Sequence, residues 1–166
     1  MGLPKLILAP VDFSEHSHAS VQVAAEYASR LGAELLLVHA VPAIPKLPSP
    51  GTIFREAEYE AELRKEAERS LQTLAQDLAK KGIRVRAEVG IANDVGMEVL
   101  RMAEHNHADL IVIATHGMTG WHKLAFGSVT EKVVKLATCP VLVLRVQPKS
   151  EQEAPNSTAS QSVVTR

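Results

Sequence analysis

Residues 110–117 read LIVIATHG and residues 127–130 read GSVT, and these two stretches decide the fold. The first opens with an uninterrupted apolar run, which is typical of a strand covered on both faces of a parallel sheet. The second begins a helical pattern. Its inward face is predicted to hold Val129, Val133, Leu136 and Ala137. A buried strand followed by a loop and a helix indicates one βαβ unit of an α/β protein.

The same alternation continues outward in both directions. Further strands are predicted at residues 6–11, 35–41, 83–89 and 141–146. Further helices are predicted before Gly32, over residues 52–81, and after a cap at Asn93 or Asp94. This order predicts an α/β fold with an open five-stranded parallel sheet, helices on both faces, strand order 3-2-1-4-5 and right-handed crossovers.

The chain is predicted to form one domain with a polar tail. Residues 1–147 carry all of the strand and helix patterns, and 166 residues suit one domain better than two. Residues 42–51 hold four prolines, a density that predicts a loop or lid. Residues 148–166 are rich in Ser, Thr, Gln and Pro with little apolar content, which predicts a disordered tail.

Composition excludes several classes of function. The formal net charge is −1, so we expect no basic surface for nucleic acid or anionic lipid. Cys139 is the single cysteine, which rules out an internal disulfide. No apolar run approaches the roughly 20 residues that span a bilayer, and the first residues do not resemble a signal peptide. We therefore expect a cytoplasmic protein that contacts neither membrane nor nucleic acid.

A ligand site is predicted at the carboxyl ends of the strands, where ligands bind in open parallel sheets. The segments at these ends are Pro10-Val11-Asp12, Ala40-Val41 and Thr115-His116-Gly117. The helix that begins near Gly127 offers free backbone N–H groups to a phosphate. Its dipole contributes only about 1 kcal/mol, so hydroxyls and further donors such as Lys123 must add to it. Neither GxxxxGK[ST] nor GxGxxG occurs in the chain.

Two of these residues have purely structural alternatives. Asp12 could cap the first helix instead of binding a ligand. Ser128 and Glu131 have the spacing of a capping box, in which each side chain bonds the other's backbone N–H. Both interpretations stay open from the sequence.

The two opening stretches together resemble the ATP-binding signature of the universal stress protein family, G-x2-G-x9-G-[ST]. Its second and third glycines fall on Gly117 and Gly127 and its hydroxyl on Ser128, whereas Ala114 replaces the first glycine. PVDFS at residues 10–14, VHA at 38–40 and CPVLV at 139–143 are similar to other stretches of that family. The resemblance covers residues 5–146 and implies a Rossmann-like fold of the adenine nucleotide alpha-hydrolase type.

The resemblance implies an adenine nucleotide, ATP or AMP/ADP, as the ligand. Asp12 would contact the base or ribose, small apolar residues would enclose the base, and the turn from Gly127 to Thr130 would hold phosphates. The implied nucleotide-binding residues are Pro10, Val11, Asp12, Ala40, Ile113, Ala114, Thr115, His116, Gly117, Gly127, Ser128, Val129 and Thr130. Mg²⁺ or Mn²⁺ would be carried by the phosphates, because the paired histidines, such as His16 and His18, lack the ligand cluster that a metal site in the protein needs.

Three functions stay open from the sequence. The first is a nucleotide-dependent switch or sensor in stress response. The second is a slow ATPase or self-phosphorylating enzyme, although no general base or arginine finger is evident near the loop and no residue is assigned a catalytic role. The third is a nucleotide-free interaction module. The resemblance to the family also implies a homodimer joined through the last strand. We therefore expect a homodimer through the edge strand Val141–Val146, with protein partners unknown.

Overall fold

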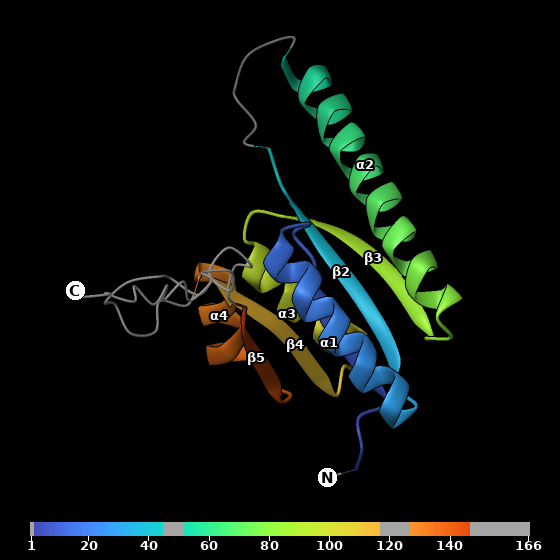
Figure 1. The fold of residues 1–166 in the computed structure, drawn as a ribbon. Coiled ribbons are helices and arrows are strands. Elements are labelled where there is room, and N and C mark those ends of the chain that lie inside the picture. Colours follow the sequence, from blue (N-terminus) through green and yellow to red (C-terminus); the bar gives the residue numbers. More distant parts are fainter. Residues whose placement is uncertain (1, 45–51, 117–126, 147–166) are drawn as a thin grey trace, which may run out of the picture.

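The structure is a computed structural model that describes residues 2–44, 52–116 and 127–146. Strands and helices alternate along these residues (Figure 1). They are β1 (Leu6–Pro10), α1 (Glu15–Leu31), β2 (Glu34–Pro42), α2 (Thr52–Lys80), β3 (Val85–Ala92), α3 (Val95–His105), β4 (Leu110–His116), α4 (Ser128–Leu136) and β5 (Val141–Val146). The predicted α/β alternation is confirmed. The predicted tail, residues 148–166, lies outside the described residues.

The strands form a single parallel sheet in the order β3-β2-β1-β4-β5, as the sequence predicts. The chain moves outward from β1 through β2 to β3, and then crosses to β4 and β5 on the other side of β1. The order therefore reverses between β1 and β4. In open parallel sheets, ligands bind in a crevice at this point, outside the carboxyl ends of the strands.

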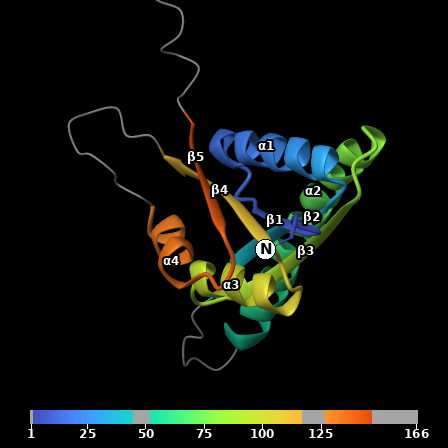
Figure 2. The same ribbon diagram turned by 90° about the horizontal axis from the view of Figure 1, so that it is seen from below.

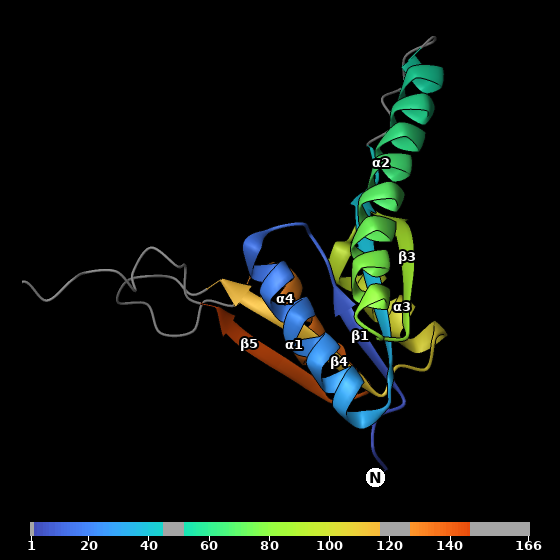
Figure 3. The same cartoon turned by 45° about the vertical axis from the view of Figure 1, so that its right-hand side comes forward.

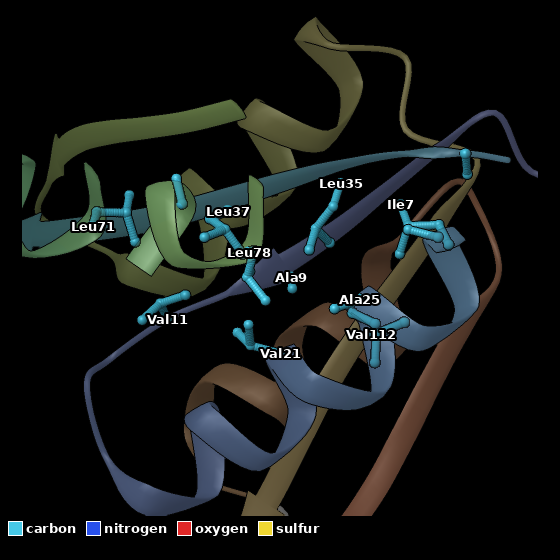
Figure 4. Packing of buried hydrophobic residues seen from close by; sticks show 14 residues of the cluster. Ile7, Ala9, Val11, Val21, Ala25, Leu35, Leu37, Leu71, Leu78 and Val112 are labelled. Carbon is cyan, nitrogen blue, oxygen red and sulfur yellow. The ribbon is translucent and has the colours of Figure 1, made fainter. Parts of the chain in front are cut away.

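Helices cover both faces of the sheet (Figure 2). Alternate residues of each inner strand point to opposite faces. On one face, Ile7 and Leu37 pack against Val21 of α1 and against Leu71 and Leu78 of α2, and all five are buried (Figure 4). Truncating one such leucine to alanine costs about 2–5 kcal/mol.

The other face packs against α3 and α4. Leu36 and Ile111 of the sheet meet Val99 of α3 and Val133 of α4, and these four side chains are also buried. Because both faces are covered, the inner strands read as uninterrupted apolar runs in the sequence.

Some predicted boundaries are wrong. The third strand begins at Val85 instead of Ile83 and continues to Ala92, past the stretch in which polar and apolar residues alternate. Pro42 ends β2 and does not begin the loop, and residues 45–51 lie outside the description. Leu136, predicted to face inward, is 54% exposed because α4 ends there beside the sheet's edge. Among the described residues, no helix is long and apolar enough to cross a membrane.

Candidate functional site

A cavity of about 230 Å³ opens at the point where the strand order reverses. Its walls come from the carboxyl ends of β1, β2 and β4 and from the first turns of α1, α3 and α4. The lining residues are Pro10, Val11, Asp12, Ser14, His16, Ser17, Val38, His39, Ala40, Val95, Val99, Ile113, Ala114, Gly127, Ser128, Val129 and Thr130. The wall is mostly apolar, with a few polar groups from the helix N-termini, from Asp12 after β1 and from His39 of β2, which is the usual character of a small-molecule site.

The structure brings ten of the sequence-predicted site residues to this cavity. They are Pro10, Val11, Asp12, Ala40, Ile113, Ala114, Gly127, Ser128, Val129 and Thr130. Thr115 is buried and lies outside the lining, and its hydroxyl has no hydrogen-bond partner among the described residues. His116 ends β4, and Gly117 and Lys123 lie outside the described residues.

Asp12 supports the start of α1 without itself capping the helix. Ser14 is the N-cap, and its Oγ accepts from the backbone N–H of Ser17 at 3.2 Å. The Asp12 Oδ1 accepts from the backbone N–H of Ser14 at 2.9 Å and from the Ser14 hydroxyl at 2.6 Å. Asp12 is exposed and lines the cavity. Its carboxylate therefore both stabilises the turn before α1 and belongs to the wall of the site.

The residue after Asp12 has a positive φ angle, which is unusual for a residue other than glycine. Phe13 has φ of 62°, in the left-handed region that bulky residues rarely adopt. Its ring lies against His39, with the centroids 4.8 Å apart. The Nδ1 of His39 is 2.6 Å from the carbonyl oxygen of Val11. A carbonyl can only accept, so Nδ1 carries the proton, and these contacts hold the β1–α1 turn in place.

The N-terminus of α4 has no side-chain cap. Gly127 is the N-cap and offers no side-chain hydrogen bond, and no side chain of the described residues bonds the first amides of the helix. Ser128 is the first helical residue, so the predicted capping box is wrong. Glu131 instead pairs with Lys135 at 2.6 Å, and this hydrogen bond lowers the pKa of the Glu131 carboxyl. The first intrahelical bond of this turn runs from the Glu131 N–H to the Gly127 carbonyl, which leaves the amides of residues 128–130 without partners in the helix.

Gly127 is not required by its own backbone. Its φ of −62° and ψ of 154° are open to any residue. The consequence of glycine here is therefore the missing side chain, which leaves space for a ligand to approach the amides closely.

Thr130 joins α4 to the end of β4. Its buried hydroxyl donates to the Ala114 carbonyl oxygen at 3.1 Å. The single hydroxyl proton is thereby used within the protein, so Thr130 sets the position of the helix start, whereas Ser128 keeps the role of the exposed hydroxyl.

The start of α3 holds α4 from the other side. Asp94 caps α3 by accepting from the Met97 N–H at 3.1 Å, and it pairs with Lys132 of α4. The hydrogen bond from Lys132, followed by that from Met97, lowers the pKa of the Asp94 carboxyl. Gly96 permits this approach, because a Cβ there would lie only 2.9 Å from Cδ of Lys132. The open helix end is thus fixed by contacts to β4 and α3.

No metal site is evident among the residues that the structure describes. No group of three or more His, Cys, Asp or Glu side chains comes together there. His16 lines the cavity but belongs to no such group of three, and Cys139 is half-buried, which raises the pKa of its thiol. A cation at the site would therefore depend on oxygen ligands from a bound phosphate and from water.

Sequence reasoning missed several lining residues. Ser14, His16 and Ser17 come from the first turn of α1, His39 from the end of β2, and Val95 and Val99 from the start of α3. Their common signal is position, because each lies within a few residues of a strand's carboxyl end or a helix's amino end. The resemblance drew attention to the strand ends and to α4 alone.

Comparison with known proteins gives a consistent result. The universal stress protein family model matches residues 4–145. A universal stress protein of Methanocaldococcus jannaschii is 33% identical, over 90% of this chain and 86% of its own. The structure of the universal stress protein UspA from Lactobacillus plantarum is 26% identical with a TM-score of 0.72, covering 85% of this chain and 97% of its own.

A third related protein shares the fold and was solved with a ligand. It is a universal stress protein from Archaeoglobus fulgidus in complex with dAMP, 21% identical with a TM-score of 0.57, covering 86% of this chain and 98% of its own.

Proposed function

The chain belongs to the universal stress protein family, and we propose that it binds an adenine nucleotide, ATP foremost, in the cavity between β1 and β4. The observation that carries the proposal is the start of α4, where no side chain of the described residues caps the helix and where residues 127–130 line that cavity. Unpaired N–H groups at a helix N-terminus, together with the helix dipole, favour a bound phosphate. The dAMP complex of the Archaeoglobus fulgidus protein supports adenine as the base.

The shape of the cavity supports an orientation for the nucleotide. Its volume of about 230 Å³ is below the roughly 300–1,000 Å³ of clefts that enclose a whole drug-sized ligand, so it suits the nucleoside part. Pro10, Val11 and Ala40 offer small apolar surfaces to a flat base. Asp12, at the rim, would accept from ribose hydroxyls. The phosphates would then extend along the amides that follow Gly127.

We propose that the bound nucleotide acts as a switch in stress response. Phosphates at the start of α4 would stabilise one arrangement of the adjoining backbone over others, and a ligand shifts a conformational equilibrium by its difference in affinity for the two states. Mg²⁺ or Mn²⁺ would accompany the phosphates. The cytoplasm is the proposed location, because Cys139 would stay reduced there.

We also propose a homodimer through β5. This strand is the last of the sheet and pairs only with β4 among the described strands. Val134 and Leu136 of the neighbouring α4 are 42% and 54% exposed, which adds apolar surface beside an unpaired edge. Sedimentation of wild type and of Leu136→Lys would test this, since a dimer that uses this surface should dissociate in the variant.

Nucleotide extraction tests the main proposal. Acid-extracted purified protein should release ATP, and added ATP at 100 times its Kd should stabilise the fold by about 2.7 kcal/mol. Gly127→Val should remove this stabilisation and keep the fold, because a branched side chain would cover the amides. Ala79→Val, on the exposed surface of α2 outside the cavity, is the matched control and should respond like wild type.

The outcomes separate the three functions. Recovered ADP would point to hydrolysis and hence to the slow ATPase. No recovered nucleotide and no thermal shift at millimolar ATP would contradict the proposal and favour a nucleotide-free interaction module.

A further inference from the structure

A second depression follows the outer edge of β3, away from the candidate nucleotide site. It is a groove of about 660 Å³ between α2, β3 and α3. Lys65 and Arg69 line it from α2, Ala87 and Val89 from β3, and Arg101 and Met102 from α3. Figure 3 shows β3 beside α2, with α3 near its lower end. The groove therefore contains the edge of a sheet between two helices.

The backbone of β3 faces this groove with alternate residues. The Arg84 carbonyl accepts from Leu35 N–H, and the Ala92 carbonyl accepts from Ala43 N–H, so even-numbered residues bond toward β2. In a parallel ladder the N–H and C=O of one residue point to the same side, and neighbours alternate. Ala87 and Val89 accordingly point both groups outward, and β3 pairs with no strand but β2 among the described residues.

Charge in the groove is unbalanced. Four cationic side chains and two carboxylates line it, from Arg64, Lys65, Arg69 and Arg101 and from Glu68 and Glu88. Arg64 pairs with Glu68 at 2.8 Å, and Arg101 is held by Glu98 at 2.6 Å. Lys65 and Arg69 enter no ion pair within the described part of the chain. They lie one helical turn apart, on the same side of α2.

Charged side chains of β3 itself pair with one another and with neighbouring elements. Arg86 pairs with Glu34 at 2.6 Å and with Glu88 at 3.2 Å, and Asn106 donates to Glu88, which also lines the groove, at 3.0 Å. Charges of this kind discourage unwanted pairing of an edge strand. Lys65 and Arg69 differ because they stand on the helix beside the strand, where they leave its backbone accessible and attract negative charge to it.

We infer that the groove binds an extended acidic peptide segment of a partner protein, which adds to β3 as a sixth strand. Backbone groups of Ala87 and Val89 would supply main-chain hydrogen bonds, as in other cases of strand addition. Side chains of an added strand alternate between faces, so every second residue would point toward α2. An acidic residue at those positions would meet Lys65 and Arg69, which selects the peptide by charge.

The test uses the full-length protein and a fluorescein-labelled eight-residue peptide in which glutamate alternates with valine. Fluorescence anisotropy at low salt should show saturable binding that weakens as salt is added. The Lys65→Glu/Arg69→Glu variant should bind at least about tenfold more weakly, since attraction becomes repulsion. Lys80→Glu/Lys81→Glu, the same charge change at the C-terminal end of α2 and outside the groove, should bind like wild type.

A second pair of measurements tests the backbone contacts. Ala87→Pro removes an outward N–H, and proline is tolerated at such positions of an edge strand, so binding should be lost with the fold intact. If that variant fails to fold, the same peptide with N-methyl groups on alternate amides should fail to bind wild type. In amide spectra, the peptide should shift the Ala87 and Val89 resonances.

Three results would overturn the proposal. Equal binding of a peptide with lysine in place of glutamate would remove the role of charge. Full retention of binding by the N-methylated peptide would remove strand addition and leave a general attraction for anions. A change of oligomeric state in the Lys65→Glu/Arg69→Glu variant, with no peptide binding by wild type, would assign the groove to a second copy of the chain.

Discussion

The helices that meet the candidate site begin in two different ways. α1 and α3 are closed by their own side chains, Ser14 and Asp94, which bond the amides of Ser17 and Met97. α4 has Gly127 as its N-cap, and within the described part of the chain no side chain bonds its first amides. The first turns of all three helices contribute residues to the same cavity. The difference in capping therefore does not arise because only one of these helix ends meets the cavity.

The difference shows which helix start is available to a ligand. A capping side chain contributes about 0.5–2 kcal/mol to stability relative to alanine but only a few tenths relative to glycine, and α4 forgoes that smaller contribution although its backbone would accept a capping residue. Thr130 and Lys132 hold the same turn in place through Ala114 and Asp94. A helix end that is fixed by its neighbours and still uncapped is suited to receive an anion.

Capping the N-terminus of α4 with a side chain should produce the largest change in ATP binding. Gly127→Asp would place a carboxylate over the amides of α4, as Asp94 does at α3. The protein without nucleotide should gain a few tenths of a kcal/mol, because Asp caps slightly better than Gly. Stabilisation by ATP, about 2.7 kcal/mol at 100 times the wild-type Kd, should vanish in thermal unfolding experiments.

Gly127→Asn separates the two reasons for that loss. It caps as Asp does without the negative charge, so residual ATP stabilisation in Asn and none in Asp would show that charge repulsion adds to amide occupation. Undiminished ATP binding by the Asp variant would mean that phosphates lie elsewhere.

Loosening the open end should produce the next largest effect. Thr130→Val removes the hydroxyl that donates to the Ala114 carbonyl and leaves that acceptor without its partner. The expected cost is about 1–3 kcal/mol, or several degrees in the midpoint of thermal unfolding. Thr130→Ser keeps the hydroxyl and should lose less stability and retain more ATP stabilisation. Equal losses in both variants would contradict this role of the hydrogen bond, because the serine variant keeps the hydroxyl that donates to the Ala114 carbonyl.

The sequence predicted the open end for partly wrong reasons. Strand order followed from alternating apolar runs, because a doubly covered parallel sheet requires them, and the position of the cavity followed from strand order. Yet Ser128 and Glu131 have capping-box spacing, and the helix starts one residue earlier than that interpretation needs. Local spacing does not reveal which residue is the last with extended backbone, since the packing of α4 decides it.

Other residues of the site were beyond sequence reasoning for a different reason. His39 belongs to the VHA stretch that resembles the family, but the sequence assigns it no contact, and only the fold brings its ring to Phe13 and the Val11 carbonyl. Lys132 and its partner Asp94 are 38 residues apart in the sequence. Contacts between distant elements depend on how helices pack, for which periodicity gives no register.

Removing the side-chain cap of α1 should have a smaller effect. It should lower the stability of the fold more than the affinity for ATP. Ser14→Ala removes the acceptor for the Ser17 N–H and should cost about 1 kcal/mol in chemical denaturation. ATP should still stabilise the variant nearly as much as wild type, because the Ser14 backbone N–H still donates to Asp12. Ser14→Thr keeps a capping oxygen and serves as control. A loss of ATP binding in the alanine variant would make α1 part of the phosphate site and weaken the contrast with α4.

Removing the ion pair between Asp94, which caps α3, and Lys132 of α4 should have the smallest effect. This effect should depend on pH. Asp94 and Lys132 are 43% and 36% exposed, so solvent screens their attraction. The pair lowers the folded-state pKa of Asp94 below its unfolded value of about 3.9. Its contribution is therefore complete above that unfolded value and is lost as the pH falls through the folded-state pKa. Asp94→Asn keeps an oxygen for the Met97 N–H and removes the charge, so wild type should be the more stable near pH 7, with the gap closing below about pH 4. Denaturation curves from pH 3 to 7 would measure this difference in unfolding free energy. A difference that persists to pH 3 would show that the asparagine amide fits the cap poorly. The ion pair would then have no measurable part in fixing α4.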